Sequence, residues 1–300
     1  MKQWLKWILG VSVLGLGIWY FLVKDYQYQV SFTSDQPMGV LFHHILDWEN
    51  YERSDAEISV ISKKNYTEIL QRVQSADSSF LYTWEIQKSS DDKTRVTAYI
   101  KDEKNEFAQK LMVPFGKNDF IKRSVENVKT VVEAQKLKAD AYKFHSIIDS
   151  VVQPTYCVFL PLKSSVRQKA TTMLEGISSI MEYIKGNDIP LNGDPFLEIT
   201  EWNEDDETIN FNFCFPIKRL DSMPYHPTLE FKATEALKGI KGEFNGNYRI
   251  SDNAWYYLIE YAEKNKIEVE KFPFEIYLND PHTGGDPRKW KAHIFLPLKK

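Results

Sequence analysis

The residue whose type and position best suit chemistry is Glu275, a carboxylate between Phe274 and Ile276 in an otherwise apolar run. A buried carboxylate without a partner is costly, so Glu275 must either face solvent or meet a partner. Tyr277 follows two residues later and therefore shares its face of a strand. Carboxylates and aromatic rings together trap organic cations, because each cation–ring contact contributes about 0.5 to 2 kcal/mol. The residues predicted to form such a ligand site are Glu275, Tyr277, Trp255, Tyr256, Tyr248 and Trp290.

Three interpretations of Glu275 remain open. It could bind a small hydrophobic or cationic ligand, or it could be the general base that activates water in a hydrolase of small electrophilic compounds. It could also be a solvated strand residue beside aromatic side chains that only pack, since aromatic residues make up 14% of the chain. The first interpretation predicts a binding or sensing protein and the second an enzyme. The third predicts a module that scaffolds other envelope proteins.

Other reactive residue types form no recognisable site. The six histidines, among them the adjacent His43 and His44, lack the spacing of metal ligands. Two cysteines, Cys157 and Cys214, are too few for a structural zinc site, and they are either buried thiols or one disulfide. The sequence therefore predicts no metal and no cofactor.

The charge balance argues against a nucleic-acid partner. Lys and Arg number 38 and Asp and Glu number 42, which gives a net charge of −4 and no basic excess to neutralise phosphates. A length of 300 residues with 43% hydrophobic residues is typical of about two globular domains.

The N-terminal segment differs from this average. Residues 7–23 carry no charge, although the mean hydropathy of the chain is −0.43. With the interfacial aromatic residues near its ends, the segment predicts a single transmembrane helix over residues 4–23. A cleaved signal peptide is the main alternative, but no small-residue cleavage motif follows Val23. The basic residues Lys2 and Lys6 place the N-terminus in the cytoplasm and the rest of the chain on the periplasmic or extracytoplasmic side.

The next part of the chain has the periodicity of a mixed α+β domain. After a strand over 26–33, residues Leu41, His44, Ile45 and Trp48 fall on one face of a short helix. Further strands are predicted over 56–62, 66–73, 80–88 and 95–101, with a long helix over 118–141.

This order resembles the START-like, or SRPBCC (polyketide cyclase-like), helix-grip fold. The stretch from Val40 to Tyr51, which ends in Leu-Asp-Trp-Glu-Asn-Tyr, looks like the first helix and the following turn of that family. The resemblance implies a curved sheet that grips the long helix around an apolar cavity for a lipid or another hydrophobic ligand. A cavity filled by the domain's own side chains is the alternative.

The C-terminal half contains an internal repeat. The segment 194–199 recurs at 272–277, and the segment 212–217 recurs at 294–298. Each copy also contains a helix, the first over 166–185 and the second starting after Ser251. The repeat therefore predicts a duplicated strand-helix-strand-strand unit.

This duplication resembles the GyrI-like, AraC-type effector-binding domain, together with the motifs at 244–248, 273–277 and 295–298. The resemblance implies a saddle of two halves with a groove for small hydrophobic or cationic molecules, and a ligand-binding glutamate at the position of Glu275. In the overlay of the two copies Leu197 stands opposite Glu275, so the acidic site is asymmetric. No helix-turn-helix pattern is present, so DNA binding is not carried over.

Together these features predict an α+β protein with a transmembrane anchor over 1–24, a helix-grip domain over 25–147 and a GyrI-like domain over 148–300. Its expected function is that of a membrane-anchored protein that binds or senses a small molecule.

Overall fold

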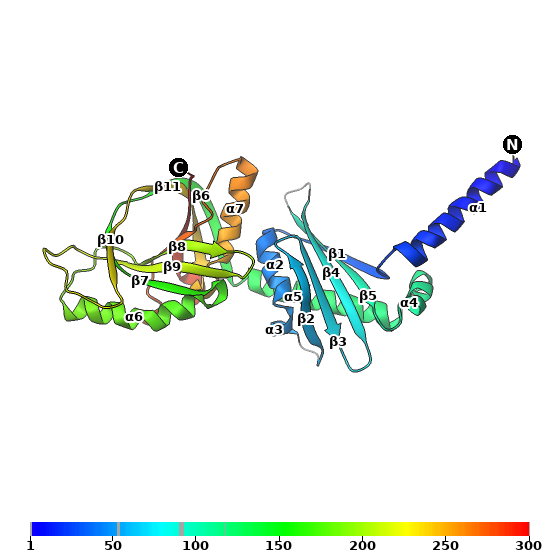
Figure 1. Ribbon diagram of the computed structural model, residues 1–300, viewed down its shortest axis with the longest axis horizontal. Helices are drawn as coiled ribbons and strands as arrows, with labels where there is room; N and C mark the ends of the chain where they lie inside the picture. The colour runs from blue at the N-terminus through cyan, green and yellow to red at the C-terminus, as the bar shows by residue number, and fades with distance from the viewer. Residues whose placement is uncertain (1, 53–54, 90–92, 117, 300) are drawn as a thin grey trace. The chain divides into compact units, whose positions relative to one another are not determined.

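The computed structural model describes residues 2–52, 55–89, 93–116 and 118–299 (Figure 1). The chain divides into two compact units, Met1–Leu137 and Lys138–Lys300. The boundary expected at 147–148 lies inside strand β6 (Tyr142–Val152), which belongs to the sheet of the second unit.

The N-terminal segment begins with helix α1 (Lys2–Ile18) and continues as a π-helical turn, Trp19–Val23. The 17 α-helical residues rise by about 25 Å, which is less than the roughly 30 Å hydrocarbon core of a bilayer. Within the described ranges the chain contains no helix with the length and apolar character needed to cross a membrane. The predicted transmembrane helix over residues 4–23, and with it that part of the predicted fold class, was therefore wrong.

The first unit is built on one antiparallel sheet of five strands in the order β1-β5-β4-β3-β2. Its strands are β1 (Tyr28–Ser34), β2 (Glu57–Lys64), β3 (Glu68–Gln74), β4 (Ser79–Lys88) and β5 (Thr94–Asp102). Its other helices are α2 (Met38–Leu46), α3 (Trp48–Tyr51), α4 (Glu106–Met112) and the long α5 (Asp119–Ala139). The short α4 escaped sequence reasoning because seven residues are too few to show helical periodicity.

The core of the first unit lies between the sheet and helices α2, α3 and α5. The predicted apolar stripe of α2 and α3 is buried, and Trp48 has no exposed surface. The Trp48 ring packs edge-on against Tyr82 at 5.0 Å and against Trp84 at 5.6 Å between ring centroids. Helix α5 contributes Val128 and Val131 to the same core, and the His44 ring of α2 hydrogen-bonds the Val131 carbonyl at 2.9 Å.

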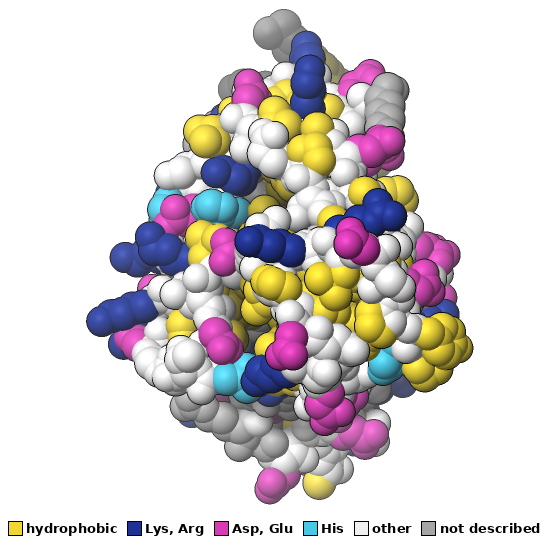
Figure 2. All heavy atoms as spheres, turned by 90° about the vertical axis from the view of Figure 1, so that its left-hand side faces the viewer, with side chains coloured by type: hydrophobic (Ala, Val, Ile, Leu, Met, Phe, Trp, Pro, Cys, Tyr) yellow, Lys and Arg dark blue, Asp and Glu magenta, His cyan; other side chains and the backbone are white. Residues whose placement is uncertain are grey.

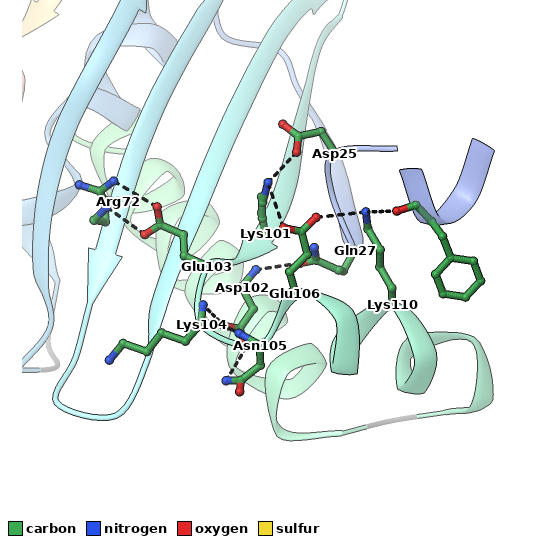
Figure 3. A network of polar contacts seen from close by, with 11 residues as sticks. Asp25, Gln27, Arg72, Lys101, Asp102, Glu103, Lys104, Asn105, Glu106 and Lys110 are labelled. Carbon is green, nitrogen blue, oxygen red and sulfur yellow. Dashed lines mark hydrogen bonds and ion pairs between the residues drawn. The ribbon is translucent and has the colours of Figure 1, made fainter. Parts of the chain in front are cut away.

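A polar network ties the end of β5 to α4 and to the segment that follows α1 (Figure 3). Lys101 pairs with Asp25 at 2.6 Å and with Glu106 at 3.4 Å. Lys110 pairs with Glu106 at 3.1 Å and donates a hydrogen bond to the Phe21 carbonyl at 3.0 Å. These contacts hold α4 beside residues 19–23.

The second unit contains one antiparallel sheet of eight strands in the order β10-β7-β9-β8-β12-β13-β11-β6. After β6 its elements are β7 (Tyr156–Ser165), α6 (Lys169–Gly186), β8 (Phe196–Asn203), β9 (Thr208–Pro216), β10 (Glu230–Ala233), β11 (Leu237–Gly246), α7 (Asn253–Asn265), β12 (Phe274–Tyr277) and β13 (Lys291–Pro297). The predicted repeat is present as β7-α6-β8-β9 and β11-α7-β12-β13, and the two copies meet where β8 pairs with β12.

Both faces of this sheet are largely apolar, and among the described residues only one face is covered by α-helices. The larger core lies on the face covered by α6 and α7. A smaller aromatic cluster, with Phe196, Phe274 and Phe295, lies on the other face. Successive side chains of a strand point to opposite faces, so alternating residues of β12 pack in the two clusters.

The surface shown in Figure 2 mixes acidic, basic and hydrophobic side chains. Lys and Arg do not gather into a continuous basic area on this face.

Candidate ligand site around Glu275

Glu275 lies in the middle of β12 and points toward the face covered by helices. Its side chain is completely buried. Lys169, the first residue of α6, and Ser251 and Trp255, at and near the start of α7, meet it there. The site therefore lies where β12, which pairs with β8 of the other copy, meets the beginnings of α6 and α7.

Four donors surround the carboxylate. The Lys169 ammonium lies 2.7 Å from Oε1, and the Trp255 indole N–H donates to the same oxygen at 2.6 Å. The Ser251 and Tyr277 hydroxyls each lie 2.7 Å from Oε2. Each donor meets the geometry of a charge-assisted hydrogen bond, so the buried charge is fully compensated.

The predicted combination of a carboxylate with an aromatic face is present, and the chain itself supplies the cation. The Lys169 Nζ lies 5.0 Å from the centroid of the Trp255 ring and 2.6 Å from the Ser251 hydroxyl oxygen. The side chains of Lys169 and Glu275 are 1% and 0% exposed. The Lys169 ammonium thus lies between the Glu275 carboxylate and the face of the Trp255 ring, and it balances the charge of Glu275.

Burial raises the pKa values of the tyrosines around the site. Burial first, and then the negative charge of Glu275, raises the pKa of Tyr277 well above its usual value. Burial also raises the pKa of Tyr248 to about 12. Both hydroxyls therefore carry a proton at neutral pH, and the Tyr277 hydroxyl can donate to Glu275.

Two of the predicted aromatic residues form a path from the surface toward this site. The partly exposed Trp290 packs on Tyr248 at 5.6 Å between ring centroids, and Tyr248 packs on Tyr277 at 4.8 Å. The Tyr248 hydroxyl donates to the Lys291 carbonyl at 2.6 Å, which fixes its ring. Trp290 and Tyr248 thus extend from Tyr277 toward the surface. Neither of them donates a hydrogen bond to Glu275.

Tyr256 lies further from the carboxylate than its neighbour Trp255. Its ring packs against Trp202 at 6.1 Å, and Trp202 packs against Trp255 at 5.2 Å between centroids. Consecutive residues of a helix point about 100° apart, so only Trp255 of this pair reaches Glu275.

Sequence reasoning missed Lys169 and Ser251. Nothing in the local pattern marks Lys169, because a lysine at the start of a helix is ordinarily solvated and its partner lies 106 residues away. Ser251 was recognised only as a helix-start signal. The one available signal was that a buried Glu275 needs a basic partner. The chain contains 38 Lys and Arg residues, so this signal does not single out Lys169.

The two cysteines lie side by side on the helix-free face. Both are free and buried. A hydrogen bond with Cys214 lowers the pKa of the Cys157 thiol, whereas burial raises the pKa of Cys214. In the described part of the chain no group of three or more His, Cys, Asp or Glu side chains is arranged to hold a metal ion.

The second unit is thus a duplicated β-α-β-β unit with the buried Glu275 on β12, the strand where the two copies meet. Residues 166–299 match the model of the GyrI-like small molecule binding domain. The second unit therefore carries a GyrI-like small-molecule binding domain. No curated protein matches the chain.

Several solved structures resemble the chain. The C-terminal domain of EcmrR is 17% identical, with 52% of this chain and 98% of that chain covered and a TM-score of 0.45. A hydrolase from Listeria innocua is 14% identical, with 56% and 98% covered and a TM-score of 0.35. SAV2435, solved with tetraphenylphosphonium, is 13% identical, with 52% and 94% covered and a TM-score of 0.35. These identities are too low to transfer a ligand or an activity.

Proposed function

We propose that the second unit binds lipophilic organic cations at Glu275, and that such a cation replaces the ammonium of Lys169. The observation that carries this proposal is the buried Glu275 carboxylate, which already holds a cation against the face of Trp255. An incoming cation would meet the same carboxylate, the same ring and the same hydroxyl of Tyr277.

The exchange conserves charge. A cation that enters while Lys169 moves to solvent leaves one positive and one negative charge in the site, as before. The ligand adds apolar contacts with the aromatic path, and the Lys169 ammonium regains its hydration. The affinity therefore depends on how readily Lys169 leaves, because only the open fraction of the protein is competent to bind.

The same geometry argues against the hydrolase. A general base needs a free carboxylate oxygen within hydrogen-bond reach of the water that it activates. Both oxygens of Glu275 are engaged by donors from the chain itself, and one of those donors is a full positive charge. This arrangement suits holding a cation better than removing a proton.

The test is calorimetric titration with tetraphenylphosphonium, with triphenylphosphine oxide as its neutral analogue. We expect the cation to bind and the neutral compound to bind at least about tenfold more weakly, because only the cation is attracted to the carboxylate and to the aromatic face. Lys169→Met should tighten cation binding by at least about tenfold, since the competing ammonium is gone.

The double variant Lys169→Met with Glu275→Gln removes both charges and should no longer distinguish the cation from the neutral analogue. Lys185→Met, an exposed lysine of the same helix, is the matched control and should bind as the unchanged protein does. Undiminished cation binding in the double variant would exclude Glu275 as the binding carboxylate.

For the first unit we propose the START-like arrangement expected from its sequence. The order strand, short helices, four antiparallel strands and long helix supports it, as does the burial of one face of α5 against the sheet. The buried rings of Trp48, Tyr82 and Trp84 fill this interior. Their packing favours a closed core over a lipid cavity.

A further inference from the structure

The two cysteines of the chain meet on the face of the second sheet that lies away from α6 and α7. Cys157 belongs to β7 and Cys214 to β9, and these two strands pair antiparallel. Cys157 stands opposite Pro216 and Cys214 stands opposite Phe159, so the two thiols are diagonal neighbours on one face. The thiols form a hydrogen bond with each other. The chain contains only these two cysteines, and folding brings both into contact.

Both thiols are enclosed by apolar side chains. Each cysteine is 0% exposed. They pack in the aromatic cluster that contains Phe159, Phe196 and Phe295. A bulky oxidant such as oxidised glutathione therefore cannot reach either sulfur in the folded protein.

A cavity of about 610 Å³ lies beside this pair. Its lining includes Pro216 and Lys232, which are the register partners of Cys157, and Phe196, which is a register partner of Cys214. The side chain of Lys232 is 26% exposed, and exposed side chains change rotamer within nanoseconds. A molecule of about the size of water therefore has a short route from the cavity to the thiols.

The surroundings distinguish the two thiols from each other. The hydrogen bond with Cys214, chiefly, and the positive charge of Lys232 lower the pKa of Cys157, against burial and the charge of Glu198. Glu198 itself pairs with Lys232. Burial, chiefly, raises the pKa of Cys214 well above its usual value. Because the thiolate is the nucleophile, Cys157 is the thiol that attacks an oxidant, and Cys214 keeps its proton.

We propose that Cys157 and Cys214 form a redox-sensitive dithiol, which hydrogen peroxide oxidises to a disulfide between β7 and β9. The Cys157 sulfur attacks one peroxide oxygen and the O–O bond breaks, so that Cys157 becomes a sulfenic acid and the other oxygen leaves as water. The Cys214 sulfur then attacks the Cys157 sulfur, and the sulfenic hydroxyl leaves with the Cys214 proton as a second water. The two thiols lose two electrons and two protons, and the peroxide is reduced to two waters.

The disulfide links two neighbouring strands of the first copy of the repeat, beside the cavity. Glu275 points to the opposite face of the sheet, toward α6 and α7. The dithiol is therefore separate from the site of the proposed function, and its test needs no ligand.

The test exposes the folded full chain to hydrogen peroxide, counts the free thiols after unfolding in guanidinium, and maps the peptides by mass spectrometry. We expect both thiols to be lost together, the peptides with Cys157 and Cys214 to be linked, and dithiothreitol to restore both thiols. An unchanged thiol count, or a loss that requires the protein to be unfolded first, would overturn the proposal. Oxidation of Cys157 to a sulfinic acid without a crosslink would also overturn it, because Cys214 would then be out of reach.

Two single variants test the separate roles of the thiols. In Cys214→Ala, peroxide should add oxygen to Cys157 and form no crosslink within the chain. In Cys157→Ala, Cys214 should stay unoxidised at the same dose, because its thiol keeps the proton. Circular dichroism confirms that each variant is folded. If Cys214 in Cys157→Ala reacts as fast as the pair does in the unchanged protein, Cys157 is not the attacking thiol and the proposed sequence fails.

A third variant tests the charge beside Cys157. Lys232→Gln should slow formation of the disulfide by at least about threefold, since the thiolate loses its neighbouring cation. Lys185→Gln, which changes an exposed lysine at the end of α6, is the matched control and should react at the rate of the unchanged protein. Equal rates in Lys232→Gln and Lys185→Gln would contradict the role given to Lys232.

Discussion

Glu275 and Lys169 form a buried ion pair. Its contribution to the free energy of unfolding depends on which residues replace it. Removal of charges from water costs several kcal/mol per ion, and the attraction between them offsets much of that cost. Such a pair adds little net stability over an apolar pair, but either member alone is strongly destabilising. Under the proposed function, a ligand displaces the Lys169 ammonium only if it supplies another positive charge to Glu275.

Lys169→Met should accordingly lower the free energy of unfolding by about 3 to 5 kcal/mol, because it leaves a buried carboxylate without its counter-charge. The double variant Lys169→Met with Glu275→Gln should recover most of that loss. Urea denaturation followed by circular dichroism measures both, with Lys185→Met expected to stay within about 0.5 kcal/mol. Losses that simply add in the double variant would show that the two residues are not energetically coupled.

The sequence allowed Glu275 and Tyr277 to be placed on one strand face, since alternation is a local property of strands. Trp255 followed from the aromatic composition of the second helix. The partner Lys169 could not be predicted, because its contact depends on how α6 crosses the sheet. Long-range pairing between two charged groups leaves no periodic trace in either segment.

The elements of the first unit were predicted well where they show periodicity. The long helix predicted over 118–141 is α5, and the four strands predicted between 56 and 101 are β2 to β5. Apolar alternation and polar turns mark such elements unambiguously. The predicted membrane span, in contrast, rested on length and hydropathy, and the change from α-helix to π-helix at Trp19 was not visible in either.

Just after β5, Glu103 contacts strands β3 and β4, and its pairing with Arg72 of β3 is drawn in Figure 3. It accepts hydrogen bonds from Arg72 at 2.9 and 3.1 Å and from the Ser79 hydroxyl at 2.5 Å. The hydrogen bonds from Arg72, chiefly, lower the pKa of Glu103. A carboxylate with a lowered pKa in the folded state stabilises the fold above its unfolded pKa of about 4.3, and this contribution disappears as the pH falls through the folded value.

The melting temperature of the first unit should therefore fall between pH 5 and pH 3, and it should fall less in Glu103→Gln, which is already less stable at pH 7. Differential scanning calorimetry at each pH measures this. The exposed Glu49→Gln serves as control and should keep the slope of the unchanged protein. An identical slope in Glu103→Gln would mean that Glu103 does not contribute to the acid sensitivity.

At the scale of the whole molecule, the chain comprises two units with separate cores. All residues described around Glu275 lie between residues 138 and 300. The aromatic core of the first unit draws only on residues before 138. Each unit thus has the buried apolar surface that an independently folding domain requires.

A fragment of residues 138–300 should therefore fold alone and bind tetraphenylphosphonium within about threefold of the full chain's affinity, since no first-unit residue takes part. Circular dichroism measures whether the fragment is folded, and calorimetric titration measures its affinity for tetraphenylphosphonium. Substitutions in one unit should leave the calorimetric transition of the other unchanged. A fragment that is unfolded while the full chain is folded would show that the second unit depends on the first.

The pairing of β8 with β12 has a consequence for how many poses a ligand can take. The strand order is a palindrome about this seam, and Leu197 pairs directly with Glu275, with Phe196 opposite Ile276 on one side and Phe274 opposite Glu198 on the other. Equivalent residues of the two copies thus meet on a local twofold axis. Two identical residues there would offer a ligand two equivalent orientations. Leucine against glutamate removes that degeneracy, so a molecule with a single charged centre has one preferred orientation on an otherwise symmetric scaffold.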